Sequence, residues 1–392
     1  MRPVYAVGIG ITKFGELWER SLRELITEAG LAAVADAGIA GEDIESMYVA
    51  SQSAGRLLGQ EQLGVLALDE AGLADTHIPA TRVEAGDASG AAALRTAYLS
   101  VASGAHAISV AGGVEKMTDV LEDEVATAFT SNSDMEWEGF FGATLPALFA
   151  MMARAHGSEF GTTREQLSAV TAKNHGHGAR NPGAAYRFPI AAAKVAQSPI
   201  VADPLRVLDC AAAVDGAAAV VLANDEVAAR LDGPKVRIAS TAQGSDTLAL
   251  HERESLTRLE STTIAASAAF ERAGISADEV QVAEVHDVFT IAEILALEAL
   301  TLFKPGEAAG ATEKGLTTYE GKVVVNPSGG LKARGHALGA TGLAQACEIV
   351  EQLRNAAGDR QVDNAATGLT HAMAGTGGTS IVHVFRAEGG GR

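Results

Sequence analysis

The residues best suited to chemistry lie in a glycine-rich stretch, residues 326–342, which follows a predicted strand and contains one histidine, His336. Glycines at this density let the backbone approach a ligand closely and take up positive φ angles. An alanine-rich helix is predicted to begin near Ala340, and the free N–H groups at its start suit an oxyanion. A histidine placed there can transfer protons near neutral pH. Taken alone, such a loop is more often structural, so the interpretation depends on the rest of the chain.

Composition bounds the class of protein. The chain has 392 residues, of which 47% are hydrophobic and 5% aromatic, so it is globular and rich in small apolar side chains. This length is enough for two domains or two fused halves. The net charge of −19 argues against binding to nucleic acid or to an anionic membrane, because no basic patch is evident.

Cysteine content and the N-terminus indicate the compartment. Two cysteines, Cys210 and Cys347, offer no disulfide framework, so a reducing environment is expected. We find no signal peptide and no run of about 18 apolar residues that could span a membrane. The sequence therefore predicts a soluble cytoplasmic protein. His175 and His177 suggest a metal pair, but no third ligand lies at a sensible spacing, so no metal site is predicted.

The chain alternates predicted strands and helices. Residues 4–11 form a buried strand, and residues 21–38 form an amphipathic helix with Ser21 as its N-cap and Gly38 as its stop. Further strands are predicted at residues 44–50, 80–85 and 107–112, with a helix ending near Gly104 before the last of them. Residues 114–201 lose this pattern. An excursion of that length is expected to be functional.

The second half of the chain repeats the first. Residues 268–275 are similar in sequence to residues 32–39, and Ala340-Thr341-Gly342 corresponds to Ala88-Ser89-Gly90. A period this long indicates two fused copies of one domain, each with a mixed, mostly parallel sheet covered by helices. The turns at Asp87 and His336 would then face one another across the join. We predict three parts: an N-terminal half of residues 1–113 plus 202–232, a loop domain of residues 114–201, and a C-terminal half of residues 233–392.

Four motifs are specific when taken together. They are Val83-Glu84-Ala85-Gly86-Asp87-Ala88-Ser89-Gly90, His286-Asp287-Val288-Phe289, Gly335-His336-Ala337-Leu338-Gly339-Ala340-Thr341-Gly342 and His371-Ala372-Met373-Ala374-Gly375-Thr376-Gly377. On these motifs the chain resembles the thiolase superfamily over essentially its whole length, most closely the archaeal and sterol-carrier-type branch. The resemblance implies an α/β fold of five layers, α/β/α/β/α, with two mixed five-stranded sheets and an inserted loop domain.

The departures from the family pattern matter equally. The family's nucleophilic cysteine falls at Asp87, and its second reactive cysteine falls at His371. Cys210 and Cys347 lie elsewhere and are best explained as small buried apolar residues. The thiolate route of the family is therefore not open to this chain.

The resemblance also implies roles for three histidines. Thiolases form or split a carbon–carbon bond next to a coenzyme A thioester, which needs a nucleophile, acid/base groups and oxyanion donors. By position, His336 resembles the base that activates the nucleophile, and His286 resembles an oxyanion-hole residue acting with a water. His371 would serve as the second acid/base in place of cysteine. For His286 a purely structural role stays open.

The nucleophile has two candidates. Asp87 could attack a thioester, but an ionised carboxylate gains nothing from a neighbouring base and is a poor acyl acceptor. The Ser89 hydroxyl could be activated by His336, with Asp87 holding the imidazolium, as in Ser-His-Asp sites. We favour Ser89 as the nucleophile and Asp87 as the residue that orients the catalytic groups or supplies negative charge to the site. A serine in this turn is equally well explained as a helix cap.

Binding residues are expected by resemblance as well. Met117 and Phe289 would line the acyl pocket, although a plain core role fits them equally, and Asn326 and Gly375 would contact substrate. Lys332 and Arg334 could meet coenzyme A phosphates, but a solvated basic pair fits them better. The aromatic run at residues 137–141 is expected to pack within the loop domain.

The favoured function is that of an acetyl-CoA C-acyltransferase, a β-ketothiolase that condenses acyl-CoA or cleaves 3-ketoacyl-CoA with a non-cysteine nucleophile. Two alternatives are a thiolase-like aldolase acting on a 3-hydroxyacyl-CoA and a non-catalytic acyl-CoA-binding or scaffold subunit. Coenzyme A and acetyl-CoA are expected as substrates, with no permanently bound cofactor. The resemblance also implies a homo-oligomer, dimer or tetramer, and a small OB-fold and zinc-ribbon partner protein.

Overall fold

The computed structural model describes residues 2–388, in which ten strands form one hydrogen-bonded sheet in the order β10-β9-β11-β12-β8-β1-β7-β4-β2-β3. The first half supplies β1 (Val4–Ile11), β2 (Ser46–Ala50), β3 (Ala80–Val83), β4 (Ile108–Glu115) and β7 (Gly216–Asn224). The second half supplies β8 (Lys235–Ser245), β9 (Val282–Glu284), β10 (Val324–Val325), β11 (Thr367–Ala374) and β12 (Thr379–Glu388). A separate ribbon pairs β5 (Ile200–Ala202) with β6 (Leu205–Arg206).

The two halves have the same topology. The order β1-β7-β4-β2-β3 corresponds strand for strand to β8-β12-β11-β9-β10, and each pair is parallel or antiparallel as its counterpart is. This confirms the predicted duplication. The two five-stranded sheets meet edge to edge, because β1 and β8 pair only at Tyr5 with Arg237 and at Ala6 with Val236. The predicted pair of sheets is therefore one continuous sheet with a short seam.

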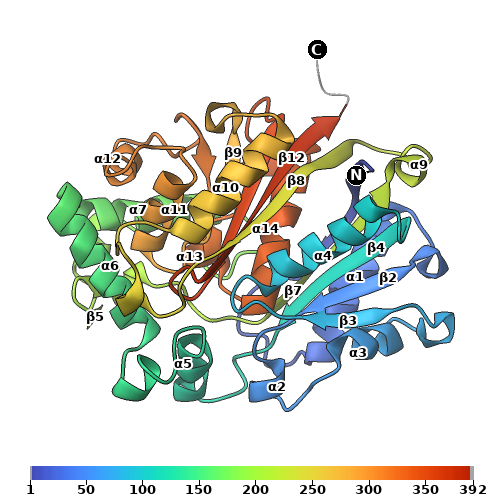
Figure 1. Cartoon of the computed structure of the whole chain (residues 1–392), viewed down its shortest axis with the longest axis horizontal. Coiled ribbons are helices and arrows are strands. Elements are labelled where there is room, and N and C mark those ends of the chain that lie inside the picture. The colour runs from blue at the N-terminus through green and yellow to red at the C-terminus, as the bar shows by residue number, and fades with distance from the viewer. Residues whose placement is uncertain (1, 389–392) are drawn as a thin grey trace.

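Helices cover both faces of this sheet. In the first half they are α1 (Leu22–Ala37), α2 (Ala54–Leu57), α3 (Leu63–Glu70), α4 (Ser89–Ser103) and α9 (Asp225–Ala228). In the second half they are α10 (Glu260–Ala273), α11 (Thr290–Ala299), α12 (Ala308–Glu313), α13 (Gly330–Arg334) and α14 (Leu338–Leu353). Helix α1 packs on β1 and α10 packs on β8, while α4 and α14 pack against each other at the centre (Figure 1). These layers confirm the α/β class and the layered arrangement.

Helix α1 shows how local sequence sets an element. The Ser21 hydroxyl accepts from the Glu24 N–H, and the Glu24 carboxylate accepts from the Ser21 N–H, so the predicted capping box is present. Gly38 ends the helix with a φ of 66°, a conformation that favours glycine. Both predicted ends of this helix are therefore confirmed.

The central helices approach each other through glycine. A Cβ atom on Gly90 of α4 would lie 2.6 Å from the Gly339 carbonyl oxygen, and one on Gly342 of α14 would lie 2.4 Å from the Ala91 nitrogen. Neither contact is compatible with a larger side chain. The two helix starts therefore touch, and they bring the turns that precede them together.

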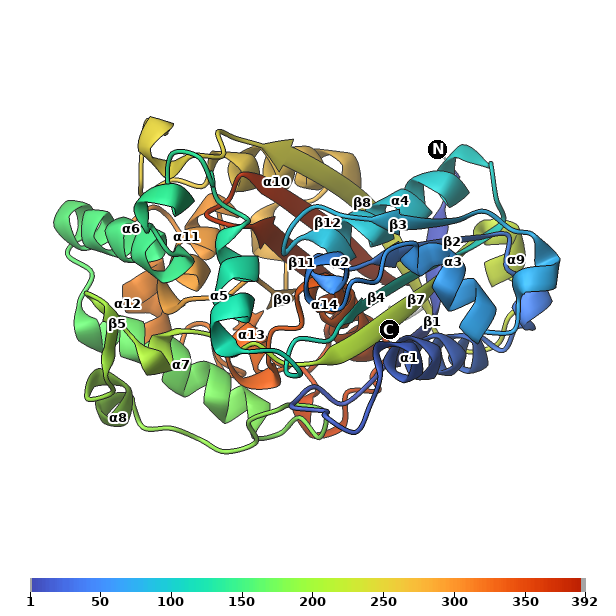
Figure 2. The same cartoon turned by 90° about the horizontal axis from the view of Figure 1, so that it is seen from below.

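The excursion between β4 and β7 carries α5 (Glu122–Thr130), α6 (Leu145–Phe160), α7 (Arg164–Gly178) and α8 (Ala192–Ala196). Figure 2 shows α6 and α7 at one end of the molecule beside α11 and α12 of the second half. Phe149 of α6 stacks on Phe289 with ring centroids 4.7 Å apart. The expectation that the aromatic run packs inside this segment is wrong, because Trp137, Phe140 and Phe141 are 63%, 80% and 72% exposed.

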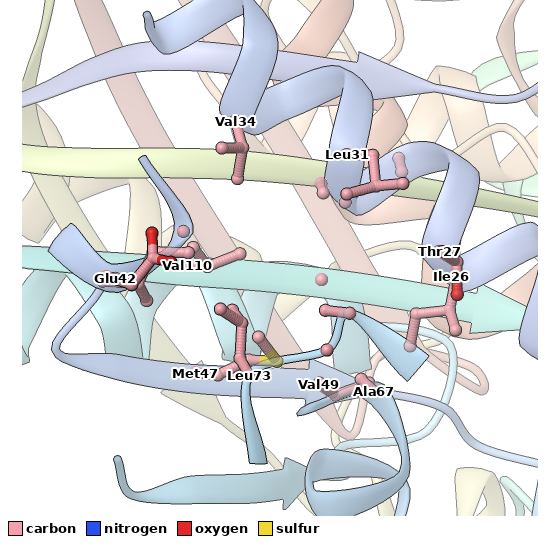
Figure 3. Close-up of a pocket in the computed structure, with 18 residues that line it drawn as sticks. Ile26, Thr27, Leu31, Val34, Glu42, Met47, Val49, Ala67, Leu73 and Val110 are labelled. Carbon is pink, nitrogen blue, oxygen red and sulfur yellow. The ribbon is translucent and has the colours of Figure 1, made fainter. Parts of the chain in front are cut away.

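An apolar pocket lies in the first half, away from the predicted site residues. It has a volume of about 270 Å³ and lies between α1, α3 and the sheet. In Figure 3, Leu31 and Val34 of α1 lie opposite Met47 and Val110 of the strands. Glu42 is the one charged residue of its lining, and no histidine or cysteine takes part. This pocket therefore offers no reactive group. Among residues 2–388, no helix has the length and apolar content needed to cross a bilayer.

Candidate active site

The two turns that precede the central helices meet at Asp87 and His336. The Nε2 atom of His336 lies 4.0 Å from the Asp87 Oδ1 atom, and both side chains are fully buried. The sequence predicted that these turns face one another across the join, and the structure confirms it.

Asp87 is held by one hydrogen bond and lies near the Gly375 backbone. The Asn132 amide donates to Oδ1 at 2.7 Å, and the nearby Gly375 N–H favours the charged form of the carboxylate. Gly86 and Gly375 both have positive φ angles and lie against Asn132. Burial raises the pKa of Asp87 to about 7, although the Gly375 N–H and the Asn132 amide oppose that shift.

His336 is fixed by its backbone and by one side chain. The backbone N–H of His336 donates to the Ala212 carbonyl at 3.0 Å. Gly335 before it has a φ of 106°, and a Cβ atom at Gly335 would collide with Val214. Its Nδ1 atom lies 2.8 Å from the Thr341 hydroxyl in the first turn of α14. Burial lowers the pKa of His336 to about 3, so the ring is neutral. Its Nε2 atom, which faces Asp87, has no hydrogen-bond partner among the described residues.

His286 completes the cluster. Its ring lies 5.2 Å from the His336 ring and at 88° to it. Asp87, His286 and His336 each offer one ligand atom, and these atoms lie within 4.8 Å of one another. Burial lowers the pKa of His286 well below its ordinary value, and within residues 2–388 neither of its ring nitrogens has a partner. The structure thus brings three of the predicted residues together.

Buried acids hold the glycine-rich loop in place. The Asp287 carboxylate accepts from the Leu331 N–H at 2.7 Å at the start of α13. Arg334 pairs with Glu284 at 3.2 Å. The expectation of a solvated pair at Lys332 and Arg334 is wrong, because these residues are only 5% and 2% exposed. Lys332 donates to the Cys210 carbonyl instead, so both cations brace the loop that carries His336.

Two predicted catalytic residues do not join the cluster. The Ser89 hydroxyl donates to the Gly86 carbonyl at 2.6 Å and accepts from the Ala85 N–H at 2.9 Å. The Ser89 hydroxyl therefore stabilises its own turn and does not cap α4, whose N-cap position is Ala88 without a side-chain cap. A hydroxyl bonded in this way favours Asp87 over Ser89 as the nucleophile. His371 lies in β11, with Nε2 3.0 Å from the Thr262 hydroxyl and Nδ1 3.5 Å from the His286 backbone nitrogen. These contacts fit a structural residue beneath the cluster rather than a free acid/base.

Of the four predicted binding residues, two line a pocket next to the cluster. Met117 and Phe289 line a pocket of about 690 Å³. Phe129 and Ala213 of the same lining touch His336, the first with ring centroids 5.5 Å apart and the second through a backbone bridge. A second pocket of about 400 Å³ lies on the Asp87 side and is lined in part by Asn132. Neighbours of the cluster therefore line both pockets, whereas Asp87, His286 and His336 belong to neither lining.

The other two predicted binding residues, Asn326 and Gly375, already interact with neighbouring groups of the protein. The Asn326 amide accepts from the Val285 N–H at 2.8 Å and donates to Glu293 at 2.9 Å, so it holds its own strained turn, with a φ of 55°. This fits a structural role rather than the predicted contact with substrate. Gly375 lies at the site, where its N–H favours the charged form of Asp87.

The cysteines are poor nucleophiles, as expected. Cys347 is buried in α14, and burial raises its pKa. Cys210 is half-buried in the lining of the larger pocket, where burial raises the pKa of its thiol to about 12. Neither provides a thiolate near neutral pH.

Sequence reasoning missed three neighbours of the cluster: Asn132, Phe129 and Thr341. Thr341 belongs to the same motif as His336, and that shared motif is the one signal that could have pointed to their contact. Asn132 and Phe129 lie in the long excursion, where no periodic pattern or motif points to the site.

An acid and two neutral imidazoles at the join of a duplicated α/β fold define a site for acid/base or acyl-transfer chemistry. The family description "Thiolase, N-terminal domain" matches residues 4–226, and "Thiolase C-terminal domain-like" matches residues 242–387. The chain therefore belongs to the thiolase family.

Individual relatives agree with this assignment. The chain is 50% identical to acetyl-CoA acetyltransferase of Methanothermobacter thermautotrophicus over 385 residues, which is 98% of this chain and 100% of the relative. It is 35% identical to sterol carrier protein 2 of Gallus gallus, over 98% of this chain and 72% of that protein. A solved structure named "Ltp2-ChsH2(DUF35) aldolase" superposes with a TM-score of 0.85 at 24% identity and covers 100% of this chain and 99% of its own. That likeness shows the fold alone, whereas the sequence relatives confirm the branch that the motifs indicated.

Proposed function

We propose that this thiolase-family protein is a coenzyme A-dependent acyltransferase, an acetyl-CoA C-acyltransferase that acts on the carbon–carbon bond beside a thioester carbonyl. The supporting observation is the meeting of Asp87, His286 and His336 at the join of the two halves. The name of the relative from Methanothermobacter thermautotrophicus, acetyl-CoA acetyltransferase, supports the same activity. Coenzyme A and its thioesters are substrates in this proposal.

In the first half of thiolysis, Asp87 passes its proton to His336 and attacks the C3 carbonyl carbon of a 3-ketoacyl-CoA. The C2–C3 bond breaks with its electron pair on C2, and the imidazolium of His336 returns the proton there, which releases acetyl-CoA. His286 donates a hydrogen bond to the developing oxyanion. The acyl group is then held on Asp87 as a mixed anhydride, which burial protects from water.

In the second half, His336 takes the proton of the coenzyme A thiol. The thiolate attacks the anhydride carbonyl, and the shortened acyl-CoA leaves while Asp87 recovers its carboxylate and takes the proton back. His336 serves both half-reactions. This removes the need for the acid/base role that was predicted for His371.

A second candidate is favoured by one observation, the pKa of Asp87, which burial raises to about 7 and which suits a general acid/base. In a thiolase-like aldolase, Asp87 would remove the proton of the hydroxyl on C3 of a 3-hydroxyacyl-CoA. The C2–C3 bond then breaks, C3 leaves as an aldehyde or ketone, and C2 receives the proton through His336. No acyl-enzyme forms on this route.

Trapping the acyl-enzyme tests the first candidate. The wild type is incubated with acetyl-CoA, the anhydride is captured with hydroxylamine, and the peptide containing Asp87 and Ser89 is mapped by mass spectrometry. We expect a hydroxamate on Asp87 that persists in Ser89→Ala and is lost in Asp87→Asn. Acetylation of Ser89 would overturn the assignment of Asp87.

Product analysis separates the remaining candidates. Release of an aldehyde or ketone from a 3-hydroxyacyl-CoA, without a trapped acyl group, would favour the aldolase. Absence of turnover on either substrate, with and without a partner protein, would point to a non-catalytic acyl-CoA-binding subunit.

We also propose that the protein forms a homo-oligomer and binds a small OB-fold and zinc-ribbon partner, as the family resemblance implies. The exposed aromatic residues Trp137, Phe140 and Phe141 offer an apolar surface for that contact. Co-purification from the native host tests the partner. Replacement of Phe140 and Phe141 by serine should abolish it, and an unchanged complex would exclude this surface.

A further inference from the structure

We propose that Asp87, His286 and His336 bind a divalent transition-metal ion, and that Zn²⁺ is the ion they suit best. The three residues come from the turn after β3, the segment after β9 and the turn before α14. One ligand atom from each lies within 4.8 Å of the other two, and all three side chains are fully buried. Two imidazoles and one carboxylate form a ligand set that zinc and related ions commonly use.

The strongest support is the set of unpaired atoms in this cluster. Asp87 Oδ2, His336 Nε2 and both ring nitrogens of His286 have no hydrogen-bond partner among residues 2–388. Buried polar atoms in folded proteins are nearly always paired. Here four unpaired atoms belong to three neighbouring side chains, and each of these side chains can turn one lone pair toward a shared guest.

The surrounding contacts orient these atoms for such a guest. Thr341 binds the Nδ1 atom of His336 at 2.8 Å and leaves Nε2 free. Asn132 donates to Asp87 Oδ1 and leaves Oδ2 free. Partners of this kind fix the rings and carboxylates of metal sites.

Only a small movement is needed to close the site. Zinc–ligand bonds of about 2.0–2.2 Å in a tetrahedral site put ligand atoms roughly 3.4 Å apart. The Asp87 atom nearest to His336 Nε2 is Oδ1, now 4.0 Å away, and this oxygen keeps a second lone pair beside its bond from Asn132. His286 can turn toward them without breaking a hydrogen bond, because its ring makes none with the described residues. A water molecule would take the fourth position.

The ion would regulate the site. This consequence rests on the proposed function, in which the Asp87 carboxylate and the His336 lone pair move a proton. An ion bound to both groups occupies the electron pairs that this transfer uses. The metal-bound protein is therefore inactive in acyl transfer, and removal of the ion restores activity.

Metal binding itself is tested on the full chain after treatment with EDTA. Zn²⁺ is titrated by calorimetry, and Co²⁺ is added as a probe whose visible absorption reports its ligands. We expect one saturable ion per chain, and affinity lower by about tenfold or more in Asp87→Asn and in His336→Gln. His251→Asn, at a largely exposed histidine outside the cluster, serves as the matched control and keeps full affinity. Thermal unfolding of each variant shows that it is folded.

The outcomes separate the two proposals. Absence of saturable binding, or equal binding in wild type, Asp87→Asn and His336→Gln, would overturn the metal site. In the activity arm, metal-free protein should cleave acetoacetyl-CoA with coenzyme A, lose that activity with Zn²⁺ and regain it with EDTA. Undiminished turnover with the ion bound would overturn the regulatory consequence. Site-specific binding without any turnover of metal-free protein would leave the metal site standing and contradict the proposed function.

Discussion

At the scale of single residues, the chemistry depends on which buried polar atoms are hydrogen-bonded within the protein and which have no partner. Ser89 and His371 have hydroxyl or ring atoms that neighbouring groups already bind. Asp87, His286 and His336 keep free atoms in a site closed to solvent. A free buried group can act on a substrate, whereas a bonded one must first break its contacts.

Replacement of Thr341 by valine tests how His336 is oriented. The change removes the 2.8 Å contact to Nδ1 and keeps the shape of the side chain. We expect kcat to fall by about fivefold, which corresponds to one hydrogen bond of about 1 kcal/mol, with KM almost unchanged. Stability should fall by about 1–3 kcal/mol, because the buried Nδ1 atom loses its partner. Thr341→Ser should restore the rate. A valine variant with wild-type kcat would show that His336 does not depend on this contact.

Replacement of Ser89 by alanine tests its structural role. The Ala85 N–H loses a buried acceptor, so we expect the free energy of unfolding to fall by about 1–3 kcal/mol. The rate of thiolysis by the folded variant should stay at the wild-type level. Urea unfolding and initial rates measure the two effects, and a large loss of rate at unchanged stability would return Ser89 to the catalytic set.

The sequence predicted much of this site. The motifs placed Asp87, His286 and His336 at corresponding positions of a resembled family, and the internal repeat predicted that the two turns meet. The sequence could not show that Ser89 is bonded within its turn, because nucleophile and cap have the same local pattern. It also offered no metal-ligand spacing, since the three ligands are far apart along the chain and only the fold brings them together.

At the scale of elements, the contact between α4 and α14 determines the distance between Asp87 and His336. Gly342→Ala would place a methyl group 2.4 Å from the Ala91 nitrogen, so the helices must move apart. We expect a loss of stability of about 1–3 kcal/mol. A shift of about 1 Å in such a site can lower the rate by roughly a hundredfold.

Gly30→Ala is the matched control for that substitution. Gly30 lies inside α1, and a Cβ atom there would meet nothing within 4 Å. Alanine should raise the free energy of unfolding by about 0.5–1 kcal/mol and leave the rate unchanged. Urea unfolding and initial rates measure both variants. Equal rates for Gly342→Ala and wild type would show that close packing of the helices does not set the site.

A buried ion pair anchors the wall of the larger pocket. Asp215 accepts from Lys116 Nζ at 2.7 Å and from the Met117 N–H at 2.7 Å. Burial alone would raise the pKa of Asp215, but the bonds from Lys116, Thr118 and the Met117 backbone outweigh it, so the pKa lies below its ordinary 3.8. The ionised form therefore stabilises the fold above the unfolded pKa, and this contribution is lost as the pH falls through the folded pKa.

Asp215→Asn tests this anchor. The change leaves the buried Lys116 ammonium without its buried partner, so we expect a loss of about 3–5 kcal/mol near pH 7. The difference between wild type and variant should shrink as the pH is lowered past the ordinary value of 3.8, because the wild-type carboxylate then becomes protonated. Urea unfolding across this range measures it. A difference that does not depend on pH would contradict the assigned ionisation.

Elements with strong local signals agreed with the prediction. Helix α1 has its capping box and terminal glycine where the sequence placed them, and β1 (Val4–Ile11) has its predicted limits. The short helix α13 was missed, because it lies within a run of glycines that indicates a turn. The Asp287 carboxylate at its start stabilises it, and that contact comes from another segment of the chain.

At the scale of the whole molecule, the duplication explains why the site exists. Each copy supplies one turn and one central helix, and neither copy holds both Asp87 and His336. The second copy and the excursion add His286 and the larger pocket. In the proposed function, the active centre therefore lies at the seam between the two copies.

The most direct test is the rate of thiolysis of acetoacetyl-CoA by metal-free wild type, Asp87→Asn and Ser89→Ala, each checked for folding by thermal unfolding. We predict acetyl-CoA formation by wild type and Ser89→Ala at similar rates, and a loss of at least about a hundredfold in Asp87→Asn. Wild-type turnover by Asp87→Asn, or its loss in Ser89→Ala alone, would contradict this prediction.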